Sequence, residues 1–198
     1  MGKVQLRVDD DYDYAHRLCR RQDRTMMQTP PVDRRDPPEA APETDMLPAF
    51  LDYHRATLLW KVDGLSESDL RRLLPPSDLT LLGLVKHLAY VERWWFQDVF
   101  AGEDVDFPWT DNDPDADWRV EGDESVATIL ALYRAQVARS REITAAANLN
   151  DQARRPRTRP PGGIQTLRWI VLHMIEETAR HNGHADLMRE AIDGATGA

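Results

Sequence analysis

Four long segments of the chain repeat apolar residues with helical periodicity, and this pattern most constrains the fold. The segments cover, approximately, residues 45–62, 80–101, 124–147 and 167–192. Gly64, Gly102 and Gly194 follow three of them and are typical helix stop signals. We find no convincing alternation of apolar and polar residues of the kind that marks a half-exposed strand. The sequence therefore predicts an all-α protein built as a four-helix bundle.

The segments outside these helices suggest how the chain is organised. Residues 1–43 are charged and rich in proline, so we expect a disordered or loosely packed N-terminal extension. Residues 44–198 would form the bundle domain. Ser66 and Asp69 resemble the cap of a short extra helical turn. A polar loop of residues 102–123 joins the second and third long helices, and a connection of that length often lines a site.

Composition excludes several classes of partner. The formal net charge of −9 argues against nucleic acid, because phosphate binding requires a basic face. A membrane span is not expected, since no apolar run approaches about 18 residues. The N-terminus has no apolar core of a signal peptide. Cys19 is the only cysteine, so no internal disulfide can form, and we expect a cytoplasmic protein.

The last helical segment, WIVLHMIEETARHNGHADLMRE at residues 169–190, holds three of the six histidines. At about 100° per residue, four ionisable residues share the stripe that should face the bundle core. These residues are His173, Glu177, His181 and His184. Because buried ionisable groups must be paired, coordinated or neutralised, exposure on the surface explains the pattern poorly.

One ion could not bind all four residues, because His173 and His181 lie about 12 Å apart along a helix. Three pairs have the spacing of one turn that metal ligands on a helix require. They are His173 with Glu177, Glu177 with His181, and His181 with His184. A third ligand must come from another helix, and His87 is the candidate because it lies on the apolar face of the second long segment. His54, in the first segment, has no partner at ligand spacing.

Two motifs carry a resemblance to a known family. LLGLVKHLAYVERWWF at 81–96 and LRWIVLHMIEETARHNGHADLMRE at 167–190 resemble the DinB superfamily of four-helix-bundle proteins. More narrowly, they are similar to the actinobacterial branch of mini-circle proteins, over about residues 44–194. The resemblance implies a divalent metal held by one histidine of the second helix and two residues one turn apart on the last.

At the site, the chain is most similar to the metal-binding domain of mycothiol-dependent maleylpyruvate isomerases, which use a His, Glu, His set. The resemblance therefore implies His87, Glu177 and His181 as the metal ligands. It implies a place for His184 beside the ligands or in a cofactor-binding or substrate pocket. His173 would serve packing or support a ligand. Zinc suits two imidazoles and one carboxylate, and nickel, iron and manganese remain open.

The resemblance also implies an activity. The activity that we favour is that of a metal-dependent thiol S-transferase or an isomerase-like enzyme, with mycothiol as the thiol and a small electrophilic molecule as the second substrate. A metal-dependent hydrolase and a non-enzymatic metal-binding or stress-response module are the alternatives. No catalytic side chain is assigned beyond the metal ligands.

A homodimer is a further expectation. Trp94 falls on the same helical face as His87, so Trp95 would point about 100° away from that face. We expect Trp95 and Phe96 to lie on a flank, covered by a partner helix or by the long loop. Relatives of this fold are often dimers, so we predict self-association.

Overall fold

The computed structural model describes residues 32–157 and 162–196. The chain divides into two units, residues 1–31 and residues 32–198, and the described residues all belong to the second. Most of the expected N-terminal extension, including Cys19, therefore lies outside the described residues. Residues 32–42 form no helix, and the Arg34 guanidinium lies 4.7 Å from the centre of the Tyr53 ring.

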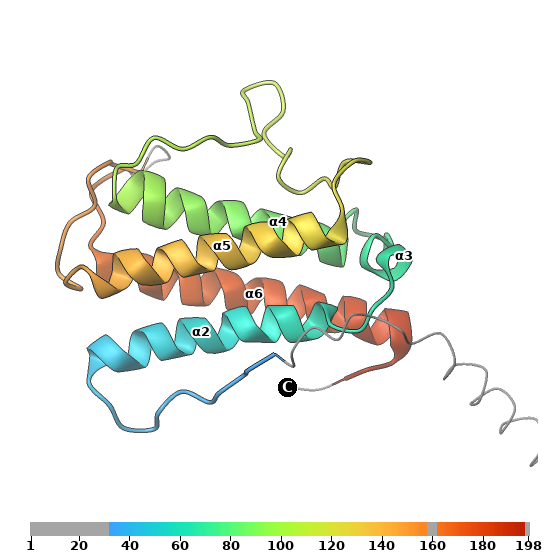
Figure 1. Ribbon diagram of the computed structural model, residues 1–198, viewed down its shortest axis with the longest axis horizontal. Helices are drawn as coiled ribbons and strands as arrows, with labels where there is room; N and C mark the ends of the chain where they lie inside the picture. The colour runs from blue at the N-terminus through green and yellow to red at the C-terminus, as the bar shows by residue number, and fades with distance from the viewer. Residues whose placement is uncertain (1–31, 158–161, 197–198) are drawn as a thin grey trace, which may run out of the picture. The chain divides into compact units, whose positions relative to one another are not determined.

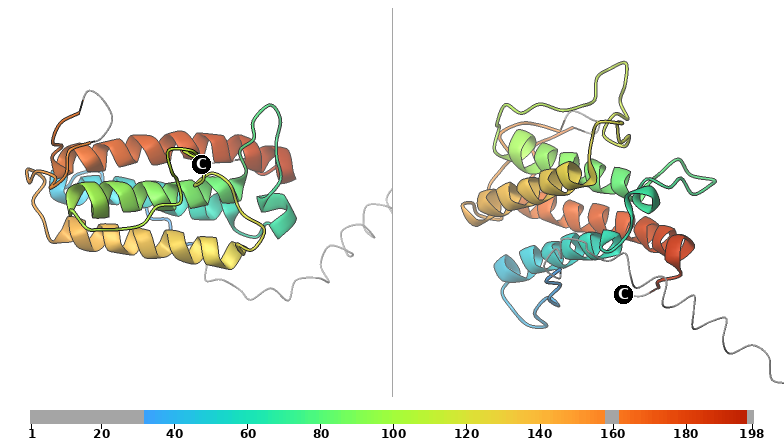
Figure 2. Two further views of the ribbon diagram at one scale, coloured as in Figure 1. Left: turned by 90° about the horizontal axis from the view of Figure 1, so that it is seen from above. Right: turned by 45° about the vertical axis from the view of Figure 1, so that its right-hand side comes forward.

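Four long helical segments make up the second unit, as the sequence predicts. The elements are α2 (Glu43–Val62), α3 (Glu67–Leu70), α4 (Leu81–Glu92), the π-helix η1 (Arg93–Phe100), α5 (Val126–Ala145) and α6 (Leu167–Asp193). The helix α2 packs along α6, and α4 packs along α5 (Figures 1 and 2). Within the described ranges the chain forms isolated bridges but no strand. The prediction of an all-α bundle is confirmed.

Hydroxyl side chains cap α3, α4, α5 and α6 and fix their N-terminal turns. Each accepts a hydrogen bond from the backbone N–H three residues later, which satisfies a donor that the helix itself leaves unpaired. The capping residues are Ser66, Thr80, Ser125 and Thr166. At the other end of α6, Gly194 takes the left-handed conformation with φ of 75°, which terminates the helix.

The second long helix changes its winding after Glu92. From Arg93 to Phe100 it is a π-helix, and the Ala101 N–H donates to the Phe96 carbonyl five residues earlier at 3.0 Å. A π-helix holds more residues in each turn, so neighbouring side chains diverge by less than in an α-helix. This winding was not predicted, and it decides where the two tryptophans point.

The expectation that Trp95 and Phe96 lie on a flank, covered by a partner helix or by the long loop, is wrong. They are 1% and 0% exposed, and they share one apolar cluster with residues of α2, α5 and α6. Both rings enter the core, whereas Trp94 in the same π-helix is only half-buried. The surface on which the dimer prediction rested is therefore absent. The homodimer itself stays a prediction.

A buried ion pair joins α2 to α4. The Arg55 guanidinium donates to both carboxylate oxygens of Glu92 at 2.7 and 2.6 Å, and the two residues are 4% and 1% exposed. Burial opposes the charge on Arg55, but the negative charge and the hydrogen bonds of Glu92 outweigh burial and raise the pKa of Arg55, so the guanidinium stays charged. Two charges so far from water are stable only as long as each keeps its partner.

We expect Glu92→Ala to lower the free energy of unfolding by about 3–5 kcal/mol, because it leaves the Arg55 charge buried with only the half-buried Asp52 nearby. Urea denaturation followed by circular dichroism would measure the loss. Glu176→Ala is the control, since Glu176 is 61% exposed and should change stability by no more than about 0.5 kcal/mol. Similar losses in both variants would contradict the prediction.

None of the helices in the described ranges is both long and apolar enough to cross a membrane.

Candidate metal centre

His87 projects from α4 toward α6 with its ring held on two sides by the long loop. Its Nδ1 lies 2.7 Å from a carboxylate oxygen of Asp117. Its ring stacks on the indole of Trp118, with centroids 3.6 Å apart and an angle of 14° between the planes. The loop therefore fixes the orientation of the imidazole and leaves the Nε2 edge pointing into the bundle.

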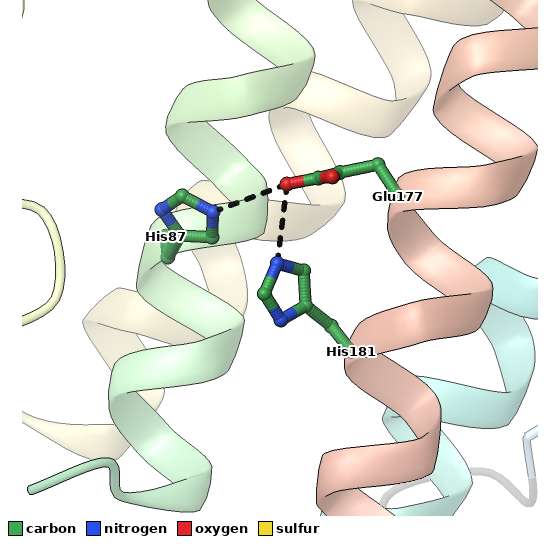
Figure 3. Close-up of side chains that lie close together, drawn as sticks. All are labelled: His87, Glu177 and His181. Carbon is green, nitrogen blue, oxygen red and sulfur yellow. Dashed lines mark hydrogen bonds and ion pairs between the residues drawn. The ribbon is translucent and has the colours of Figure 1, made fainter.

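Glu177 and His181 face His87 from α6, one turn apart (Figure 3). Glu177 Oε1 lies 3.1 Å from His181 Nε2 and 3.7 Å from His87 Nε2. One nitrogen or oxygen of each residue lies within 4.8 Å of those of the other two. The two helices thus bring together two imidazoles and a carboxylate, which are the three residues expected from the sequence to act as ligands.

The trio fits a metal ion by two independent criteria. First, His87 Nε2 is buried and has no hydrogen-bond partner, although a buried polar atom without a partner is costly. Second, two nitrogens and one oxygen are donors that zinc and related divalent metals accept, and three protein ligands leave a position open for another molecule. A cation bound between the three residues would give the unpaired nitrogen a partner.

Charge at the site also favours a cation. The neighbouring imidazoles of His181 and His87 hold the pKa of Glu177 well below its usual range, so its carboxylate remains ionised. Burial alone would lower the pKa of His87, but the hydrogen bond with Asp117 and the negative charges of Asp117 and Glu177 outweigh burial and raise it. Two carboxylates thus flank His87, and they stabilise either a proton on the imidazole or a metal cation beside it.

Asp117 and Trp118 are the residues of this site that sequence reasoning missed. Both lie in the polar loop, which runs along the outer side of α4 (Figures 1 and 2), and Asp117 is 4% exposed. A carboxylate that accepts a hydrogen bond from Nδ1–H fixes the tautomer in which Nε2 is free to bind a metal. The only hint in the sequence was the length of the loop, because several other acidic residues surround Asp117.

Gly83 lets the loop approach α4 closely. A Cβ atom at this position would lie 2.5 Å from the Trp118 carbonyl oxygen, which no ordinary packing allows. Lys86, one turn along the helix, donates to the Arg119 carbonyl at 2.6 Å and pairs with Glu124 at 2.8 Å. The start of α4 therefore anchors the segment that orients His87.

The two remaining histidines of α6 lie on either side of the trio and outside it. His184 is exposed, and its Nδ1 lies 3.4 Å from His181 Nδ1. His173 stacks on Trp169 with centroids 5.1 Å apart and meets the edge of Trp95 at 4.9 Å, and burial lowers its pKa. His54 lies on α2 and likewise takes no part in the trio. Of the three spacings left open by the sequence, the geometry brings only Glu177 and His181 together with His87.

We expect Asp117→Asn to weaken divalent metal binding by about 10- to 100-fold, because the imidazole loses the charged acceptor that orients it and strengthens it as a donor. Competition with a chromophoric chelator would measure the affinity for zinc. Asp111→Asn is the matched control, since Asp111 is an exposed acidic residue of the same loop. If the two variants bind zinc alike, Asp117 does not support the site.

Fold and site together define a helical bundle whose facing helices carry a possible divalent metal site. Residues 46–194 match the family model described as mycothiol-S-transferase, and the chain belongs to this family. The match agrees with the resemblance to the DinB superfamily seen in the two sequence motifs. No curated protein matches the chain.

Proposed function

We propose that the protein is a metal-dependent S-transferase that joins mycothiol to a small electrophilic molecule, with His87, Glu177 and His181 as the metal ligands. The observation that carries the proposal is the buried Nε2 of His87, which has no hydrogen bond and faces a carboxylate and a second imidazole across the bundle. The family match supports mycothiol as the thiol. Zinc is the metal we favour for this donor set.

A divalent cation bound at this site would favour the thiolate form of a sulfur ligand, which is the nucleophilic form. The side chains around the trio prepare the donor atoms. Asp117 would hold the proton of His87 on Nδ1, so that Nε2 stays free. When His181 turns Nε2 toward the site, its Nδ1–H can donate to His184 Nδ1, 3.4 Å away. His184 would then orient His181 as Asp117 orients His87.

The transfer itself requires one proton to leave and one bond to form. The thiol releases its proton to solvent, and the sulfur then shares an electron pair with the electrophilic carbon of the second substrate. The bond from that carbon to its leaving group breaks, and the leaving group departs with the bonding electrons. The described side chains near the trio would bind and orient the reactants, and we assign none of them as a protein nucleophile.

The proposal is tested by loading the purified protein with zinc and supplying mycothiol with 1-chloro-2,4-dinitrobenzene. We expect the S-dinitrophenyl conjugate and chloride to form faster than in the metal-free protein. Hydrolysis of ester or amide substrates without any thiol would instead support the hydrolase alternative. A protein that binds zinc but accelerates neither reaction would favour a binding or stress-response module.

A further inference from the structure

A second feature of the same face of α6 is a pocket of about 270 Å³ beside His184. It lies between the C-terminal half of α6 and the segment that connects α3 to α4. Pro75, Pro76 and Leu79 form one wall, and Leu187 and Met188 form the other. Because His184 lines the pocket and also approaches His181, this one imidazole links the pocket to the candidate metal centre.

The lining of the pocket selects against charged and hydroxyl-rich molecules. No Asp, Glu, Lys or Arg side chain lines it within the described ranges, and His184 and Ser77 are its only polar side chains. The Ser77 hydroxyl already accepts a hydrogen bond from the Leu79 N–H at 3.1 Å. A ligand with many hydroxyl groups would lose its hydrogen bonds to water here without replacing them, which is unfavourable.

We propose that this pocket binds the electrophilic substrate, and that this substrate is a small, uncharged, largely apolar molecule. The proposal rests on the function proposed above, since it assigns the thiol to the metal and the acceptor to the pocket. Mycothiol carries many hydroxyl groups and is therefore a poor occupant of these walls. An acceptor held against Met188 and Leu187 would place its reactive carbon at the His184 end, nearest to the trio.

Direct binding is the first test, and it does not depend on turnover. The compound 1,3-dinitrobenzene has the size and polarity of the reactive acceptor but no leaving group. We expect it to shift the methyl NMR signals of Met188 and Leu79 at saturation, in the metal-free and in the zinc-loaded protein alike. Unshifted methyl signals at both residues would overturn the proposal, whatever the activity. Shifted signals in a protein without transferase activity would instead mean that the proposed function fails while the pocket remains a binding site.

The second test introduces a charge at the rim of the pocket. Leu187 is 68% exposed, so replacing it should preserve the fold. With saturating mycothiol, we expect Leu187→Asp to raise the KM for 1-chloro-2,4-dinitrobenzene about tenfold. Leu187→Lys should lower the KM for its anionic analogue, 4-chloro-3,5-dinitrobenzoate, relative to the neutral compound. Neither substitution should change the Kd for mycothiol.

Leu172→Asp and Leu172→Lys are the matched controls, because Leu172 is 49% exposed on the same helix and does not line the pocket. They should leave both KM values unchanged. If Leu187→Asp fails to fold, Ala191→Trp fills the pocket from its exposed rim and should raise the KM for the neutral acceptor. A weaker Kd for mycothiol with an unchanged acceptor KM would show that the thiol occupies the pocket, and would overturn the proposal.

Discussion

His87→Ala and His181→Ala are each expected to abolish stoichiometric binding of zinc while leaving the helical circular dichroism spectrum intact. Either substitution reduces the site to two ligands, and a carboxylate with one imidazole binds a divalent cation weakly at neutral pH. The fold should persist because neither side chain belongs to the two apolar clusters that form the core. Elemental analysis of protein dialysed against micromolar zinc would measure the metal content.

Two further histidines provide controls on the same molecule. His54→Ala removes an imidazole from α2 that lies outside the trio, and it should leave the metal content at one ion per chain. His184→Ala should weaken zinc binding without abolishing it, because it removes only the side chain that orients the ligand His181. Full metal content in both His87→Ala and His181→Ala would refute the ligand assignment. Loss of metal in His184→Ala with retention in His181→Ala would move the third ligand one turn along α6.

The sequence predicts most of the fold because the signals that define a helix lie within the helix or at its ends. Helical periodicity locates α2, α5 and α6 to within about two residues. The hydroxyl of Ser66 marks the start of α3, and Gly194 marks the end of α6. The π-helix could not be predicted in this way. Trp95 and Phe96 of this segment pack with apolar residues of α6, and such contacts between distant segments leave no periodic pattern in the sequence.

The residues of the candidate site also differ in whether the sequence could predict them. Glu177 and His181 are one turn apart, so the sequence alone predicts that their side chains share a face, and the family resemblance selects them with His87. Asp117 could not be predicted. It meets His87 across 30 positions of sequence through an irregular loop whose path is set by the close approach to Gly83 and by the bonds of Lys86. Side chains in an irregular loop follow no regular spacing in the sequence, so no rule singles out one carboxylate among several.

Binding of mycothiol to the zinc-loaded protein is expected to release close to one proton. A thiol that binds to a divalent metal does so as the thiolate, so it must lose its proton on binding. Below the pKa of the free thiol, about 8.5 for a cysteine-type sulfur, the affinity should therefore rise about tenfold per pH unit, because protons compete with the metal for the sulfur. Above that pKa the affinity should level off, since the thiol is already ionised.

Isothermal titration calorimetry in two buffers of different ionisation enthalpy counts this proton directly, because the difference in heat reports the protons that the buffer takes up. His87→Ala, which should hold no metal, is the control and should show no mycothiol binding. A hydrolase would behave differently, since thiols would act only as inhibitors and the ionisation of a water molecule would govern its rate. Binding of mycothiol with the same affinity and no proton release in the His87→Ala protein would show that recognition depends on the body of the thiol, and it would remove the metal from the proposed function.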